Sequence, residues 1–251
     1  MDVYAGAAAL DFAAGAASRP DITLAALREA LGLTCALSTL HYVLVAMGLT
    51  FKKDVARGRA GARADIKAGR RRWKSKRRNW HRSRLVFIDE AGAKTNMTRR
   101  YGRARRGRRC HDSAPHGHGA TTSIIASVRS DGSTTHTTVS GATNTENFRS
   151  YVRDVLAPTL RRGDIVVLDN LPPHKNKETL EIITRAGARV AFLPAYSPDL
   201  NPIEKMGSKI KACLRSTKAR TLPALINAIQ SAFSSVSTQD VIGWFTSCGY
   251  T

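Results

Sequence analysis

The stretch Val166–Asn170 constrains the fold of this chain more than any other. An apolar run ends at Leu168, Asp169 follows at once, and a turn-like Asn-Leu-Pro-Pro sequence comes next. A short apolar run bounded by turn residues is typical of a strand buried on both faces. Such a strand would carry the Asp169 carboxylate to the edge of a sheet. The segment Leu85–Asp89 repeats this design, so we expect a second buried strand that ends in an acid.

A third acid, Glu204, follows the loop 197–201 and falls in the first turn of an expected helix. Three carboxylates from three separate elements are what a two-metal phosphodiester site needs. Mg²⁺ prefers oxygen ligands and keeps part of its shell for water and phosphate. We therefore predict Asp89, Asp169 and Glu204 as catalytic, metal-binding acids for two Mg²⁺ ions, with Mn²⁺ a plausible substitute.

Each acid also has a simpler interpretation. An Asp at a strand end is often only a turn former or a helix cap. If Asn201 is the N-cap and Pro202 the first helical residue, Glu204 could reach back to the cap as a capping box. Asp199 is the rival acid, but a helix fixes the direction of Glu204, whereas Asp199 lies in a loop. His174 and Asn170 are candidates to support Asp169, with His174 also a possible proton carrier.

The remaining pattern predicts an α/β domain with a mixed sheet and flanking helices, whose site lies along the sheet edge. Asp131-Gly132 is a hairpin-turn signal between two β-rich runs. The expected order is β-β-β-α-β-α-β-α, with strands at 85–90, 122–128, 134–140, 165–168 and 189–193, and helices at 144–156, 175–186 and from 202 onward.

Residues 22–48 predict two short helices, the first capped by Thr23 and ended by Gly32. This is the outline of a helix-turn-helix, although any helical hairpin has the same periodicity. The basic sequence that follows favours DNA. On this interpretation the second helix would read bases through Ser38, Thr39 and His41.

The positive charge of the chain is local. The net charge is +21, and residues 52–84 hold 15 Lys and Arg against two acids, while 94–109 hold eight against none. Charge of this density favours a polyanion, because each neutralised phosphate releases counterions. A solvated helix face or a flexible linker is the plainer alternative. The residues expected to contact the DNA backbone are Lys52, Lys53, Arg70, Arg71, Arg72, Lys74, Arg77, Arg78, Arg99, Arg100, Arg103, Arg105 and Arg106.

Other classes of protein are disfavoured. The four cysteines form no CxxC pair, so neither a zinc site nor a disulfide framework is indicated, and free thiols fit a reducing compartment. No apolar run approaches the roughly 18 residues of a membrane span. The Ala-rich start lacks the basic region of a signal peptide. We expect no membrane partner.

Together these motifs resemble the DDE transposases of the IS630 group, relatives of the Tc1/mariner elements. The resemblance rests on Phe87–Glu90, on Val167–Asn170 with His174, and on Tyr196–Glu204, with 34 residues between Asp169 and Glu204. It implies an RNase H-like catalytic domain behind a helix-turn-helix region, with Asp89, Asp169 and Glu204 as the metal-binding acids. It also implies double-stranded DNA partners: terminal inverted repeats, and a TA dinucleotide as target. A homodimer on DNA and a cytoplasmic, nucleoid-associated location in a bacterium are expected.

The expected domains are a weakly ordered start (1–21), a partial helix-turn-helix region (22–51), a basic linker (52–83) and an RNase H-like catalytic domain (84–251).

Two features depart from the family pattern. The first of two helix-turn-helix units is not evident, and Gly207 stands where a bulky aromatic is common, three residues after Glu204. A helical Gly costs about 1 kcal/mol relative to Ala and leaves a hole.

We therefore predict a transposase that cuts element ends and transfers the freed 3′ hydroxyl to target DNA. The main alternative is an inactive remnant that occupies element ends as a DNA-binding repressor. A nuclease acting on RNA–DNA hybrids is a third interpretation, which leaves the helix-turn-helix without a use.

Overall fold

The computed structural model describes residues 22–49, 64–115 and 121–251. The chain divides into two compact units, one formed by Met1–Arg57 with Thr98–Ser113 and the other by Gly58–Met97 with Ala114–Thr251. The predicted contacts of Lys52 and Lys53, and the expected character of residues 1–21, lie outside the described residues. None of the helices described is long and apolar enough to cross a membrane.

The smaller unit contains two short helices, α2 (Leu24–Ala30) and α3 (Leu37–Ala46), as the periodicity predicts. Thr23 caps α2 by accepting a hydrogen bond from the Ala26 amide at 3.1 Å. Gly32 ends it with a φ of +59°, a conformation open to glycine. The two helices pack through a small apolar cluster of Ile22, Leu27, Leu40, Leu44 and Leu49. Whether this pair works as a helix-turn-helix stays a prediction.

The larger unit is built on a five-stranded mixed sheet of order β3-β2-β1-β4-β5. The central strand β1 runs antiparallel to β2 and parallel to β4. The predicted order of elements and the predicted mixed α/β fold are both confirmed. The strands are β1 (Leu85–Ala93), β2 (Thr122–Arg129), β3 (Thr134–Ser140), β4 (Ile165–Leu168) and β5 (Arg189–Phe192).

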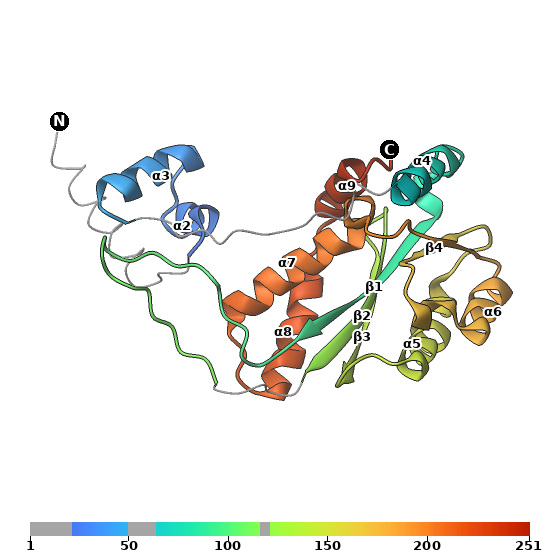
Figure 1. Ribbon diagram of the computed structural model, residues 1–251. Helices are drawn as coiled ribbons and strands as arrows, with labels where there is room; N and C mark the ends of the chain where they lie inside the picture. The colour runs from blue at the N-terminus through green and yellow to red at the C-terminus, as the bar shows by residue number, and fades with distance from the viewer. Residues whose placement is uncertain (1–21, 50–63, 116–120) are drawn as a thin grey trace. The chain divides into compact units, whose positions relative to one another are not determined.

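Helices cover both faces of this sheet (Figure 1). On one face lie α5 (Thr145–Tyr151), which continues as a wider turn over Val152–Leu156, and α6 (Lys177–Arg185). On the other lie α7 (Pro202–Thr217), α8 (Leu222–Ser234) and α9 (Thr238–Ser247). Alternate residues of β1 and β4 enter the two cores, because successive side chains on a strand point to opposite faces. Phe87 and Val167 join the α7–α9 core, and Val86 and Val166 join the α5–α6 core.

Part of the expected basic linker is helical and belongs to this unit. Helix α4 (Ala64–Arg77) packs through Trp73, which is 5% exposed and donates a hydrogen bond from Nε1 to the Tyr250 hydroxyl at 3.1 Å. Arg77 lies over the Tyr250 ring and donates to the Cys248 carbonyl at 2.7 Å. Helix α4 is therefore fixed against the end of the chain by a buried aromatic pair.

Candidate active site

The strand register places Asp89 and Asp169 together. Phe87 pairs with Val167 in the parallel β1–β4 ladder, and each Asp lies two residues further along its chain. Because side chains alternate, both carboxylates leave the sheet on the face of Phe87 and Val167. That face is the one covered by α7. The prediction that the two acids come from neighbouring strands is confirmed.

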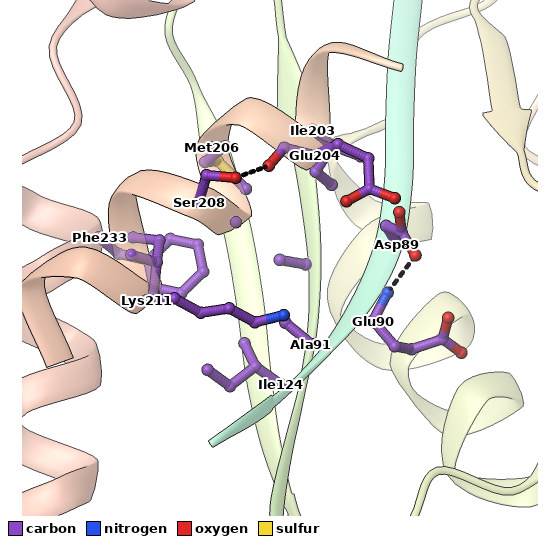
Figure 2. A pocket seen from close by; sticks show the side chains of 13 residues that line it. Asp89, Glu90, Ala91, Ile124, Ile203, Glu204, Met206, Ser208, Lys211 and Phe233 are labelled. Atoms are coloured by element: carbon purple, nitrogen blue, oxygen red, sulfur yellow. Dashed lines mark hydrogen bonds between the residues drawn. The ribbon is translucent and has the colours of Figure 1, made fainter. Parts of the chain in front are cut away.

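Helix α7 brings Glu204 to the same place. Its apolar side buries Ile203, Met206 and Ile210 against the sheet, which leaves Glu204 exposed in the first turn. Figure 2 shows the Glu204 carboxylate pointing toward Asp89. A cleft of about 500 Å³ is lined by Asp89, Asp169 and Glu204 together. The three acids thus share one opening at the sheet edge.

Asn201 does not serve as the helix cap that the sequence suggested. It occupies the N-cap position of α7, but its side chain makes no capping hydrogen bond. Its Nδ2 instead donates to the Asp89 Oδ2 at 3.1 Å, and its Oδ1 is buried without a partner among the described residues. The capping-box alternative for Glu204 therefore does not hold. Asn201 orients Asp89 and leaves one oxygen free to accept a hydrogen bond.

Asp89 is partly buried and lies close to other carboxylates, which disfavours its charged form. Burial and the nearby charges of Glu204 and Asp169 together raise its pKa to about 7, against one hydrogen bond from the Glu90 amide. Like charges that share a site oppose each other's ionisation. A cation placed between these carboxylates would offset the repulsion that opposes their ionisation.

Asp169 has the opposite balance. Burial works against its charged form, but hydrogen bonds from His174 and from the Leu171 amide outweigh burial and lower its pKa. His174 is 1% exposed and packs against the Phe148 ring. Its Nδ1 bonds Asp169, and its Nε2 bonds the Glu90 carboxylate at 2.9 Å. Burial lowers the pKa of His174, but these two acids raise it to about 9. His174 is therefore hydrogen-bonded to Asp169, and its supporting role in the site stays a prediction.

Asp199, the rival acid, is engaged elsewhere. Arg70 of α4 binds both of its carboxylate oxygens, at 2.7 and 2.5 Å. The hydrogen bond to Arg70 lowers the pKa of Asp199. This pair occupies Arg70, one of the residues expected to contact DNA. Asp199 therefore fixes a loop and is not among the residues that line the cleft.

The donor set fits a hard divalent ion, because every group is an oxygen. The acids that line the cleft are the residues that would hold it, and the unpartnered Asn201 oxygen is suited to a water in its shell. Among the described residues, no group of three or more His, Cys, Asp or Glu side chains already has the arrangement of a metal site. The assignment of Asp89, Asp169 and Glu204 as metal ligands therefore remains a prediction.

Three residues of the site escaped the sequence reasoning. Glu90 was passed over because, one residue after Asp89, it points to the other face, where it meets His174. Asn201 was assigned to capping. Lys211 lies seven residues after Glu204, so helical periodicity could have placed it on the same side of α7. Figure 2 shows Lys211 reaching toward β1 near Ala91.

Gly207 borders a cavity of about 60 Å³ beside the acids, lined also by Ile124, Met206 and Phe233. A side-chain carbon at Gly207 would meet no atom within 4 Å. The space expected from the missing aromatic is therefore present. Asn170 lines the large cleft and is exposed.

The residues expected to contact DNA differ in exposure. Most are exposed: Ser38, Thr39 and His41 on α3; Arg71, Arg72 and Lys74 on α4; Arg78 directly after α4; and Arg100, Arg105 and Arg106 in the smaller unit. Arg99 lines a basic concavity of about 390 Å³. Three are already engaged, since Arg70 binds Asp199, Arg77 donates to the Cys248 carbonyl and the buried Arg103 donates to the Ile22 carbonyl. Exposed guanidinium groups on α4 are free to approach a phosphate backbone.

Comparisons with known proteins agree with this geometry. The family described as DDE superfamily endonuclease matches residues 84–226. A search of curated proteins gives no match. Among solved structures, "Mos1 transposase paired-end complex with left transposon end" matches with a TM-score of 0.60 at 16% identity, covering 95% of this chain and 74% of that chain.

Two further structures share the fold. "Crystal structure of the mariner Mos1 paired end complex with Mg" has a TM-score of 0.60 at 16% identity, covering 90% of this chain and 70% of that chain. "Structure of Mos1 transposase catalytic domain and Raltegravir with Mg" has a TM-score of 0.54 at 14% identity, covering 76% of this chain and 91% of that chain. Their catalytic core has the RNase H-like fold that the sequence predicted.

Proposed function

Because the chain belongs to the DDE superfamily endonucleases, we propose that it is a DNA transposase of the Tc1/mariner type. It cuts the phosphodiester backbone at the ends of a mobile element and joins the freed 3′ hydroxyl to target DNA. The observation that carries this proposal is the convergence of Asp89, Asp169 and Glu204 on one cleft at the sheet edge. The fold shared with Mos1 complexes that contain transposon ends supports the choice of DNA as substrate.

Asp89, Asp169 and Glu204 would hold two Mg²⁺ ions, with Mn²⁺ as a substitute; Mos1 structures contain each metal. When bound, such ions supply the positive charge that activates an attacking oxygen and stabilises the leaving one. Asn201 holds Asp89 in place through its Nδ2 hydrogen bond. His174 keeps Asp169 ionised and fixes its direction from the opposite side. Lys211 offers an ammonium group to the phosphate next to the one that is cut.

The basic segments bind the DNA backbone in this proposal. Exposed side chains of α4, such as Arg71, Arg72 and Lys74, neutralise phosphates and carry no sequence information. Helix α3 reads bases in the terminal inverted repeats through Ser38, Thr39 and His41. The target is a TA dinucleotide, the acting form is a homodimer on DNA, and the location is the bacterial nucleoid. Residues 84–251 with α4 form the catalytic domain, and membership of the IS630 group is part of the same proposal.

Single carboxylate substitutions test the chemistry. Asp89→Ala and Asp169→Ala should abolish Mg²⁺-dependent cleavage of DNA that carries the element ends, while DNA binding stays nearly unchanged. Asp154→Ala is a matched control, because Asp154 is an exposed acid paired only with its neighbour Arg153 among the contacts described. Cleavage that persists in both active-site variants would remove the assignment.

One observation favours the alternative that the protein is an inactive transposase remnant that binds the element ends as a repressor. The unfilled space at Gly207 borders the acids, so the first turns of α7 lack packing where the site needs rigidity. A plasmid excision assay separates the two functions, because a repressor would protect the element ends without releasing the element.

A further inference from the structure

An exposed aromatic side chain stands at the rim of the catalytic cleft. Tyr196 lies in the loop between β5 and α7, and 66% of it is exposed. It lines the same cleft as Asp89, Asp169 and Glu204. The exposed ring of Tyr196 offers a flat apolar surface to any ligand that occupies this cleft.

The backbone at Tyr196 is held in an unfavourable conformation. Its φ is +52°, in the left-handed region, where a bulky residue is an outlier. Of the described residues other than glycine, Lys218 also has a positive φ, but Lys218 ends helix α7, where that conformation is ordinary. Tyr196 ends no helix. Strain of this kind persists only where the surroundings impose it, and it clusters at functional sites.

The surroundings that impose it are visible in the next residues. Arg70 donates to the Ser197 hydroxyl at 3.0 Å and to both oxygens of Asp199. Tyr250 donates to the Leu200 carbonyl at 2.8 Å. Ser197 and Leu200 are buried, whereas Tyr196 is not. Helix α4 and the end of the chain therefore fix the loop and leave the Tyr196 ring as its projecting part.

We propose that Tyr196 is a stacking platform for one nucleobase beside the phosphate that is cut. The inference rests on the proposed function, since it assumes that DNA occupies the cleft. A neutral phenol ring cannot neutralise a phosphate, but its face matches the face of a base. Inside a duplex that face is covered by neighbouring bases, so the platform receives a base that has left the stack. Every base has such a face, and the contact is tolerant of sequence.

Three variants separate the ring from the backbone. Tyr196→Phe keeps the ring. Tyr196→Gly removes it and also suits a positive φ, so the variant should be at least as stable as the original protein. Tyr196→Asn removes the ring and still tolerates the left-handed region. The probe is a DNA duplex that ends in a short unpaired strand with 2-aminopurine at successive positions, bound without divalent ions.

In the original protein and in Tyr196→Phe, we expect a fluorescence change at one position of the unpaired strand. In Tyr196→Gly and Tyr196→Asn that change should disappear, and affinity for the unpaired end should fall about tenfold, with fully paired DNA much less affected. Thermal unfolding and the stabilisation by Mg²⁺ should be kept in all three variants.

Unchanged affinity and fluorescence in Tyr196→Gly would overturn the inference, as would equal loss in Tyr196→Phe or a large loss of thermal stability in Tyr196→Gly. Absence of cleavage by the original protein, with the ring-dependent signal intact, would instead count against the transposase alone. The two proposals therefore fail in different ways.

Discussion

Replacing Asp89 and Asp169 by their amides should change the stability of the protein in opposite directions. Asp89→Asn removes a carboxylate whose pKa is raised to about 7, and Asp169→Asn removes one whose pKa is lowered. A raised pKa in the folded state means that the charged acid opposes folding above its unfolded pKa of about 4. A lowered pKa in the folded state means that the charged acid stabilises the fold above its unfolded pKa. Asp89→Asn should therefore stabilise the metal-free protein at neutral pH, and Asp169→Asn should destabilise it.

The magnitude for Asp89 follows from its contacts. The Asp89 pKa rises from 3.8 to about 7 on folding, and each tenfold change in the ionisation constant corresponds to about 1.4 kcal/mol. The destabilisation by the charged acid is therefore about 4 kcal/mol at most, and it is smaller in practice because the side chain is only partly buried. The acid accepts hydrogen bonds from Glu90 and Asn201 at its two oxygens, and an amide keeps only one acceptor oxygen, which costs about 1 kcal/mol. The net gain is about 1–3 kcal/mol, or roughly 2–10 °C in Tm for a chain of this size. Asp169→Asn loses a charge-assisted bond to His174, worth about 1.5–3 kcal/mol.

The assay is thermal unfolding in a chelator between pH 5 and pH 8. The gain in Asp89→Asn should shrink as the pH falls below about 7, because the folded protein then protonates Asp89 and the penalty disappears. Addition of Mg²⁺ should stabilise the original protein more than the Asp89→Asn variant, since the amide is the poorer ligand. Shifts of the same sign in both variants, or a gain in Asp89→Asn that is independent of pH, would refute the reasoning.

Three further predictions concern helix propensity, a buried ion pair and DNA contact. Gly207→Ala and Gly243→Ala should each stabilise the protein by about 1 kcal/mol in thermal unfolding, because both gain helix propensity and neither new methyl group would meet an atom within 4 Å; a much larger gain at Gly207 would show that the neighbouring cavity closes around the methyl group. Asp164→Ala should cost about 3–5 kcal/mol in denaturant unfolding, because it leaves the buried guanidinium of Arg129, now 2.6 Å from the Asp164 carboxylate, without its ion-pair partner. A cost below about 1 kcal/mol would contradict this. Arg71→Ala with Arg72→Ala should weaken DNA binding at all sequences and lower the salt slope by about 2, and a sequence-dependent loss measured by titration would argue against backbone contact.

Local sequence predicted the catalytic fold well, because burial and periodicity are recorded in neighbouring residues. The run Val166–Leu168 has to be a buried strand wherever it lies, and α5 begins after an Asn144 cap, inside the helix predicted at 144–156. The boundaries were less accurate. Strand β1 extends to Ala93, three residues past the predicted end, because its pairing with β2 continues to Thr122.

Side-chain partners across long distances could not be predicted in the same way. Asn201 has the residue type and the position of a helix cap, and only the approach of β1 turns its amide to Asp89, 112 residues away. Glu90 follows a catalytic candidate, and only the position of His174 gives it a partner on the far face. Arg70 looked like a DNA contact, and only the packing of Trp73 on Tyr250 brings it to Asp199.

The sequence by itself determined which elements form and in which order, because hydrophobic period and turn residues act over a few positions. It also placed an acid at the end of the apolar run of β1, directly after β4 and in the first turn of α7. The tertiary structure decided which polar side chains meet. It set the pKa values of Asp89 and Asp169 in opposite directions and left the Tyr196 ring at the rim of the cleft. These properties depend on burial and on charges brought together from distant segments, and the distance between such segments is fixed only when the cores on both faces of the sheet have packed.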